Sequence, residues 1–128
     1  MRKVYLDNAA TTPIHPEVIT SMMNVLQNDF GNPSSTHSFG RSAKTLVESA
    51  RKSIAKLLNA QASEIIFTSS ATEATNWILT SAVKDLGIKR IITTKIEHHA
   101  TLHTVEHLAK EFGIQVEYVT ILSNGNID

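Results

Sequence analysis

The sequence predicts an α/β fold built on a parallel sheet, and two observations carry that prediction. From residue 64 to residue 119, short apolar runs alternate with segments of helical apolar spacing, an order typical of βαβ units. Hydrophobic residues make up 41% of the 128 residues, which is enough for a packed core. This length suits one ordinary domain or a piece of a larger one.

Two helices are expected before the first strand. The first begins at Pro16, where the missing amide costs no hydrogen bond, and fades near Asn28. The second spans residues 39–58 and carries one continuous apolar stripe. Polar loops at 7–13 and 30–37 flank the first helix, and loops of this kind either cap a surface or line a site.

Three short apolar runs are predicted to be strands. They are Glu64–Phe67, Arg90–Thr94 and Gln115–Val119, and each is separated from the next by a helical segment. Because ligands of such sheets bind beyond the carboxyl ends of the strands, the loops after the first two strands are expected to share one rim.

The two connecting helices are expected at 71–84 and 100–112, each followed by a glycine stop, Gly87 and Gly113. We predict that the side chains facing the sheet are Ala71, Ala74, Ile78, Ala82 and Leu86 in the first helix, and Leu102, Val105, Ala109 and Phe112 in the second.

The start of the 71–84 helix is a candidate anion site. Ser70 and Glu73 have capping-box spacing, so Ser70 is expected to accept from the amide of Glu73, whose carboxylate reaches back to the amide of Ser70. The remaining amides of the first turn, with the helix dipole behind them, suit a phosphate. The alternative is a well-capped helix without a ligand.

Two polar residues follow the second strand on the same rim. His98 offers a flat, titratable ring beside the anion site, or else makes only a local hydrogen bond. Lys95 is the lysine best placed to carry an aldehyde cofactor, and the alternative is an exposed charge at a strand end.

A metal site is not expected. His99, His103 and His107 share one helical face, and two histidines four residues apart can bind a metal. The sequence has no His-Glu-x-x-His motif, however, and no carboxylate completes the set at a recognised spacing. A solvated polar face is the simpler interpretation.

Composition excludes several classes of function. Twelve basic and 12 acidic residues give a net charge of zero, so nothing draws the chain to nucleic acid or to a membrane surface. The chain has no cysteine, which excludes disulfides and a cysteine nucleophile within it. No transmembrane run or signal-peptide pattern occurs, so a cytoplasmic location is expected.

Four motifs in series resemble those of the cysteine desulfurases, pyridoxal-phosphate enzymes of the class V aminotransferase group. The match covers the whole chain in order, which makes it far more specific than any single motif. The matching segments are Tyr5–Pro13, Phe30–Ser35 with His37, Glu64–Glu73 with Asn76, and Lys95–Ala100.

The resemblance implies a fold and a set of site residues. Ala71 and Thr72 align with the residues that hold the phosphate of pyridoxal 5'-phosphate, and His98 aligns with a catalytic histidine that stacks on the pyridine and assists proton transfers. The fold would be the first part of the large domain of a fold-type I enzyme. Residues 1–15 would lie on the small-domain side, and 16–128 would begin the large domain.

The resemblance also implies an activity for the complete protein. It would convert L-cysteine to L-alanine and pass the sulfur, as an enzyme persulfide, to an acceptor or scaffold protein for iron–sulfur or thio-cofactor synthesis. It would act as a homodimer. The family's cofactor lysine, its persulfide cysteine and its pyridine-pairing aspartate would lie beyond residue 128, so we expect an N-terminal portion that is inactive alone.

Two alternatives remain open. One is a selenocysteine lyase or another class V aminotransferase-like enzyme, which the persulfide-cysteine loop would distinguish. The other is a non-catalytic, truncated domain that folds and associates without turnover.

Overall fold

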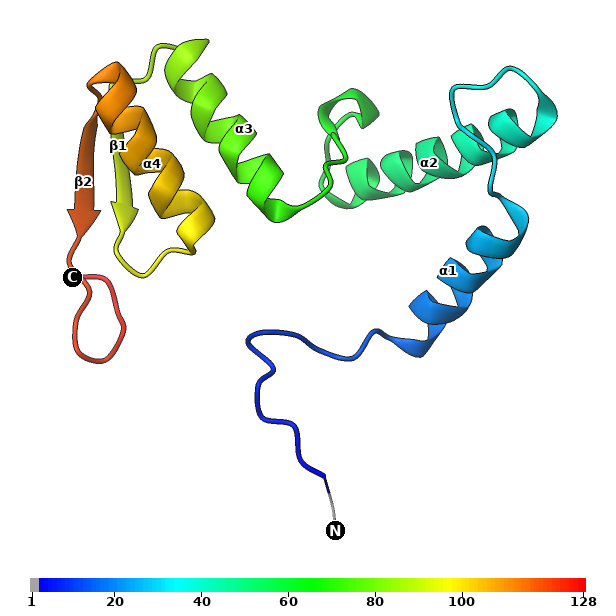
Figure 1. The fold of residues 1–128 in the computed structure, drawn as a ribbon, viewed down its shortest axis with the longest axis horizontal. Coiled ribbons are helices and arrows are strands. Elements are labelled where there is room, and N and C mark those ends of the chain that lie inside the picture. Colours follow the sequence, from blue (N-terminus) through cyan, green and yellow to red (C-terminus); the bar gives the residue numbers. More distant parts are fainter. Residues whose placement is uncertain (1–2) are drawn as a thin grey trace. The chain divides into compact units, whose positions relative to one another are not determined.

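The computed structural model describes residues 3–128 of the chain. Contacts divide the chain into two compact units, Met1–Ile66 and Phe67–Asp128. Figure 1 shows the order of helices and strands along the chain.

The first unit contains the two predicted helices. α1 spans Pro16–Asn28 and has its proline in the first turn, and the amide of Asp29 closes it on the carbonyl of Val25. α2 spans Ser38–Leu57, one residue earlier at each end than predicted. Both predictions are therefore confirmed.

The loop between α1 and α2 packs tightly against the start of α2. A Cβ atom on Gly31 would clash with the carbonyl of Phe39, and one on Gly40 would clash with the carbonyl of Ser35. The Ser42 hydroxyl also donates to Asp29 Oδ1 over 2.6 Å. Glycine is needed at these two positions because backbone lies where a side chain would be.

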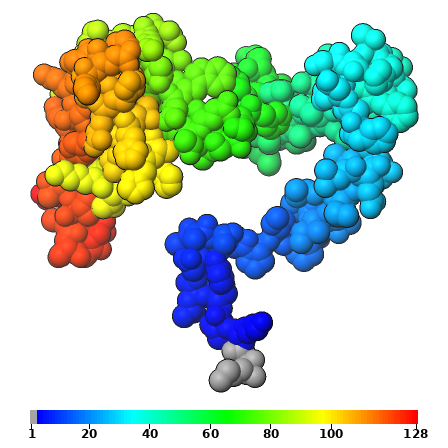
Figure 2. All heavy atoms as spheres, in the orientation of Figure 1, coloured from blue at the N-terminus to red at the C-terminus, as the bar shows by residue number. Residues whose placement is uncertain are grey.

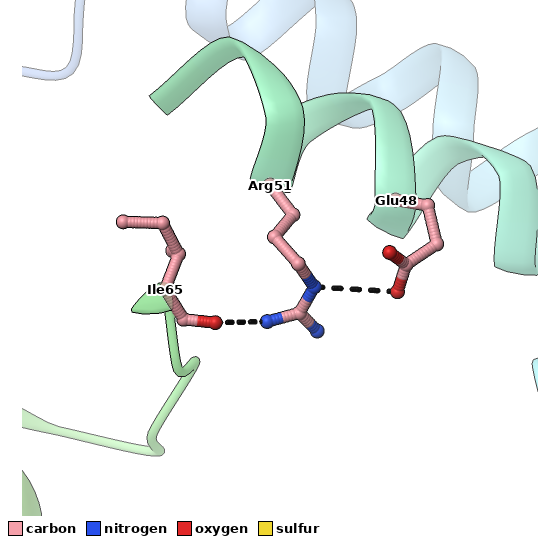
Figure 3. Close-up of polar contacts among 3 residues, drawn as sticks. All are labelled: Glu48, Arg51 and Ile65. Atoms are coloured by element: carbon pink, nitrogen blue, oxygen red, sulfur yellow. Dashed lines mark hydrogen bonds and ion pairs between the residues drawn. The ribbon is translucent and has the colours of Figure 1, made fainter. Parts of the chain in front are cut away.

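The predicted strand at 64–67 is wrong. A 3₁₀ turn, η1 (Ala62–Glu64), begins this stretch, and the Glu64 carboxylate accepts from the amide of Gln61 over 2.6 Å. Figure 3 shows the Arg51 guanidinium between the Glu48 carboxylate and the carbonyl of Ile65, to which it donates. Strands need a paired neighbour, and no strand pairs with this stretch within residues 3–128.

The second unit contains α3 (Ala71–Lys84), β1 (Arg90–Thr94), α4 (His99–Phe112) and β2 (Gln115–Val119). β1 and β2 pair in parallel, from Arg90 opposite Gln115 to Thr94 opposite Val119. The parallel βαβ unit is thus confirmed, as a two-stranded sheet instead of the expected three strands.

The core of this unit joins both helices to one face of the strand pair. Val83, Leu108 and Ile114 are buried together, and Leu79, Ile91, Ala109 and Val116 pack around them. Figure 2 shows α4 packed in this unit, and its contacts are with α3 and β2. Gly113 ends α4 with φ 66°, as its position predicted.

Burial corrects part of the predicted inward faces. In α3, Ile78 is exposed, whereas Val83 is buried, and Leu86 is exposed beyond the end of the helix. In α4, Val105 is fully buried as predicted, but Phe112 is 37% exposed. The side of α3 that packs is therefore not the predicted one. Several of the residues that gave the apolar spacing are alanines, and alanine can lie on either a buried or an exposed side of a helix.

The apolar stripes of the first unit stay largely open to solvent. No residue of α1 is buried, and in α2 only Gly40, Ala43 and Ala55 are. Separately, every helix within residues 3–128 is too short or too polar to cross a membrane.

Candidate cofactor-phosphate site

The N-terminus of α3 is capped as its sequence predicted, with one difference. Ser70 is the N-cap, and its Oγ accepts from the amide of Glu73 over 3.2 Å. The Glu73 carboxylate does not reach the amide of Ser70. It accepts instead from the amide of Ser69 over 2.6 Å and from the Ser69 hydroxyl over 2.7 Å.

These contacts have an electrostatic consequence. The hydrogen bonds from the Ser69 side chain and backbone favour the ionised carboxylate, so they lower the pKa of Glu73 from its ordinary value. The negative charge of Glu73 is therefore held against Ser69, on the N-terminal side of the Ser70 cap. The cap completes the helix without occupying all of its amides.

Two amides of α3 are left for a ligand. Within residues 3–128, the backbone N–H groups of Ala71 and Thr72 donate to no protein group, and neither does the Thr72 hydroxyl. These donors stand at the positive end of the helix dipole. The arrangement can bind an anion through two amides and a hydroxyl.

The same first turn forms one wall of a pocket of about 380 Å³. The opposite wall is the beginning of α4. The pocket brings together all three residues that the resemblance selected, and its lining is Ser70, Ala71, Thr72, Thr75, His98, Ala100 and Thr101.

His98 is the N-cap of α4. Its backbone is extended, with φ −60° and ψ 146°, and its Nδ1 accepts from the amide of Ala100 over 3.1 Å. The ring of His99 meets it edge-on, with 6.2 Å between centroids. The His98 ring thus lines the pocket and also makes the local hydrogen bond that the sequence suggested.

A polar contact connects the two walls of the pocket. The Thr104 hydroxyl on α4 contacts Asn76 Oδ1 on α3 and lies 2.7 Å from the carbonyl of Ala100. Asn76 was part of the sequence motif without an assigned role. Its place in the structure is to hold α3 and α4 in register one turn beyond the pocket.

Lys95 is not part of this pocket. Its ammonium lies 5.7 Å from the centroid of the Tyr118 ring, and it lines a different pocket with Ile96 and Thr120. This geometry suits a cation–π contact at the end of β1. The exposed-charge interpretation of Lys95 fits the structure better than the cofactor-bearing one.

The remaining histidines of α4 are occupied with one another or with a neighbouring carboxylate. The rings of His99 and His103 lie 5.4 Å apart, and His107 Nε2 lies 2.7 Å from Glu111 Oε2. No group of three metal-ligating side chains gathers anywhere in the described part of the chain.

Sequence reasoning missed two residues of the pocket, Thr75 and Thr101. Thr75 stands three residues after Thr72, so both lie on one side of α3. Thr101 stands in the first turn of α4, three residues after its N-cap. Helical spacing from Thr72 would have found Thr75, and spacing from the capping residue His98 would have found Thr101.

Comparison with known proteins shows which family the chain resembles. The family model described as Aminotransferase class-V matches residues 4–128. The cysteine desulfurase IscS of Clostridium botulinum (strain Kyoto / Type A2) is 46% identical over 97% of this chain and 32% of its own length. That of Dictyoglomus turgidum (strain DSM 6724 / Z-1310) is 44% identical over 99% and 32%.

Solved structures agree with these relatives. A NifS-like protein superposes with a TM-score of 0.85 at 41% identity, over 94% of this chain and 33% of that one. The apo cysteine desulfurase of Thermococcus onnurineus NA1 superposes with a TM-score of 0.82 at 28% identity, over 98% and 32%. The α/β fold predicted from the resemblance is therefore confirmed.

The chain spans about a third of the length of the curated relatives it matches. The match to the family model nevertheless extends over almost every residue of the chain. The chain belongs to the class-V aminotransferase family.

Proposed function

We propose that this chain is part of a pyridoxal-phosphate-dependent cysteine desulfurase. The complete enzyme would convert L-cysteine to L-alanine and take up the sulfur as a persulfide. The observation that carries the proposal is the pocket where the open amides of Ala71 and Thr72 stand across from the His98 ring. The similarity to named cysteine desulfurases supports the choice of substrate.

The residues of the pocket fit the cofactor. Two amides and the Thr72 hydroxyl suit a phosphate dianion at a helix N-terminus. The flat imidazole of His98 suits contact with a pyridine ring. When bound, pyridoxal 5'-phosphate supplies an electron sink for bond cleavage at the α-carbon. Ala71 and Thr72 would hold its phosphate, and His98 would orient the ring and take part in proton movement.

Other parts of a complete site must come from elsewhere in the enzyme. Within the described residues no lysine lines the pocket, and the sequence contains no cysteine. We infer that the lysine, the persulfide cysteine and the pyridine-pairing aspartate follow residue 128. In this proposal residues 1–15 lie on the small-domain side and residues 16–128 begin the large domain.

The wider role is inferred from the resemblance alone. We propose a homodimer that delivers sulfur to an acceptor or scaffold protein for iron–sulfur or thio-cofactor synthesis. A cytoplasmic location stays a prediction.

Binding measurements with the Thr72→Ala variant test the proposal. Loss of one charge-assisted hydrogen bond is expected to weaken the binding of both pyridoxal 5'-phosphate and inorganic phosphate by about 1–2 kcal/mol. Calorimetry reads both ligands, and pyridoxal without phosphate serves as the matched ligand, whose affinity is expected not to change. Thr72→Ser keeps the hydroxyl and is expected to restore binding.

Thr45→Ala is the control variant, because Thr45 is an exposed helical threonine whose hydroxyl bonds only within α2. Equal phosphate affinity in the Thr72→Ala and Thr45→Ala variants would refute the site. Release of alanine from L-cysteine by the complete enzyme tests the activity separately.

A further inference from the structure

The ring of His98 makes a hydrogen bond that the proposed function does not use. Nδ1 accepts from the backbone amide of Ala100 over 3.1 Å and so caps α4. A nitrogen that accepts an amide proton carries no proton itself. Since a neutral imidazole has a single N–H, that proton is on Nε2.

Nε2 is the polar atom that His98 has left for a ligand. It lies on the ring edge away from Nδ1, and it makes no hydrogen bond with any group in the described part of the chain. His98 lines the pocket together with Thr72 and Thr75. The polar group that the neutral His98 ring has left for a ligand of this pocket is thus an N–H donor and not a basic lone pair.

We propose that His98 acts on the ligand as a hydrogen-bond donor through Nε2–H, and that a second proton on its ring competes with the cap of α4 for the Nδ1 lone pair. The inference rests on the proposed function only in taking this pocket as the ligand site. A proton reaches Nδ1 when the amide of Ala100 moves away. Only then is an imidazolium formed that can give up its Nε2 proton.

Among the described residues, the groups around the His98 ring include no carboxylate of the pocket lining that could pair with a second proton on the ring. On α4 the neighbouring titratable group is the His99 ring, with 6.2 Å between centroids. On α3 the pocket wall consists of Ser70, Ala71, Thr72 and Thr75, which carry no charge. In the preceding segment Lys95 is directed to Tyr118. No carboxylate lines the pocket among residues 3–128.

The tautomer of His98 gives the first test. Long-range ¹H–¹⁵N correlation spectra of the labelled protein, at a pH where the ring is neutral, report which nitrogen carries the proton. The His98 signals are assigned by their loss in His98→Asn. We expect the proton on Nε2 alone, with His103 as the control ring that bonds no backbone amide. A proton on Nδ1 of His98 would overturn the proposal.

Exchange of the Ala100 amide gives the second test. Asparagine is a good N-cap and alanine is a poor one, so His98→Asn is expected to keep the protection, and His98→Ala to speed exchange roughly five- to tenfold. In the wild-type protein, exchange corrected for its intrinsic pH dependence is expected to rise as His98 becomes protonated. His103→Ala is the control variant and should change nothing at Ala100.

Unchanged exchange in His98→Ala, or wild-type exchange that does not follow His98 protonation, would overturn the proposal. The wild-type measurements remain decisive even where a variant does not fold. None of them needs the cofactor, so failure here is distinct from failure of the proposed function, which phosphate binding reports.

Discussion

The helices α3 and α4 begin at the same pocket, but their first turns are used differently. Each has 14 residues and an extended capping residue whose side chain accepts a backbone hydrogen bond. In α3 the cap reaches the third helical residue, Glu73, and passes over Ala71 and Thr72. In α4 the cap reaches the second, Ala100, and the amides of Thr101 and Leu102 bond to the His98 carbonyl.

The choice of capping residue decides what each helix end can offer. A serine cap is small, so it completes the helix and leaves two amides that face outward. A histidine cap places a ring over the turn, so the end of α4 presents a flat surface with one N–H. One side of the pocket is thereby suited to charge and the other to the face of a ring.

The largest expected effect comes from a mutation in the core that packs α3 against α4. Leu108 is 1% exposed and lies in the core with Val83 on α3. Leu108→Ala is expected to cost about 2–4 kcal/mol in free energy of unfolding because it leaves a cavity. Urea titration measures this cost, and phosphate binding is expected to fall with it.

The control is Leu86→Ala, since Leu86 is 76% exposed and its loss is expected to change the unfolding free energy by less than about 0.5 kcal/mol. Equal costs for the two leucines would mean that this core does not hold α3 and α4 together.

A smaller effect is expected from mutation of the Ser70 cap, which tests whether the caps of α3 and α4 are independent. Ser70→Ala is expected to cost about 1 kcal/mol of unfolding free energy, and Ser70→Gly only a few tenths. Because the cap of α4 is made by another residue, exchange of the Ala100 amide should stay as in the wild type. A matching rise of exchange at Ala100 would show that the two ends are not independent.

The smallest effect concerns the carboxylate of α3, which has no counterpart in the first turn of α4. The Ser69 hydrogen bonds lower the pKa of Glu73 below its ordinary 4.5. Because the pKa is lower in the folded state, the ionised carboxylate stabilises the fold at pH values above its ordinary pKa. This stabilisation disappears as the pH falls through the folded-state pKa. Glu73→Gln is therefore expected to flatten the acid side of the stability profile.

Urea midpoints measured between about pH 3 and pH 7 read the Glu73→Gln profile. Glu106→Gln is the matched control, a glutamate of α4 for which no hydrogen bond is found within residues 3–128. If both variants follow the wild-type curve, the contact with Ser69 does not stabilise the fold.

What the sequence predicted well depends on near neighbours. Pro16, Ser70 and Gly113 mark helix ends through their own backbone or hydroxyl, so the positions of α1, α3 and α4 follow from a few adjacent residues. The meeting of Thr72 and His98 was also predicted, from the two helix starts that follow the predicted strands, although only the strand before His98 forms.

What the sequence predicted poorly depends on partners far along the chain or on competition between close ones. The apolar run 64–67 reads as a strand, but pairing is a property of two segments, and this one has η1 and a bond to Arg51 instead. Glu73 had two serines within reach, and capping-box spacing named Ser70 where the structure uses Ser69. Side-chain direction decided that choice, and spacing does not encode it.

The contacts that shape the pocket also bear on how the chain folds. Thr104 meets Asn76 over 28 positions, and the strands that pair flank a single helix. The entropy cost of closing such a loop grows only slowly with its length, whereas the pairing of parallel strands is itself slow. We expect residues 67–128 to fold as one unit, so the open amides of α3 and the His98 ring would come together in a single folding step.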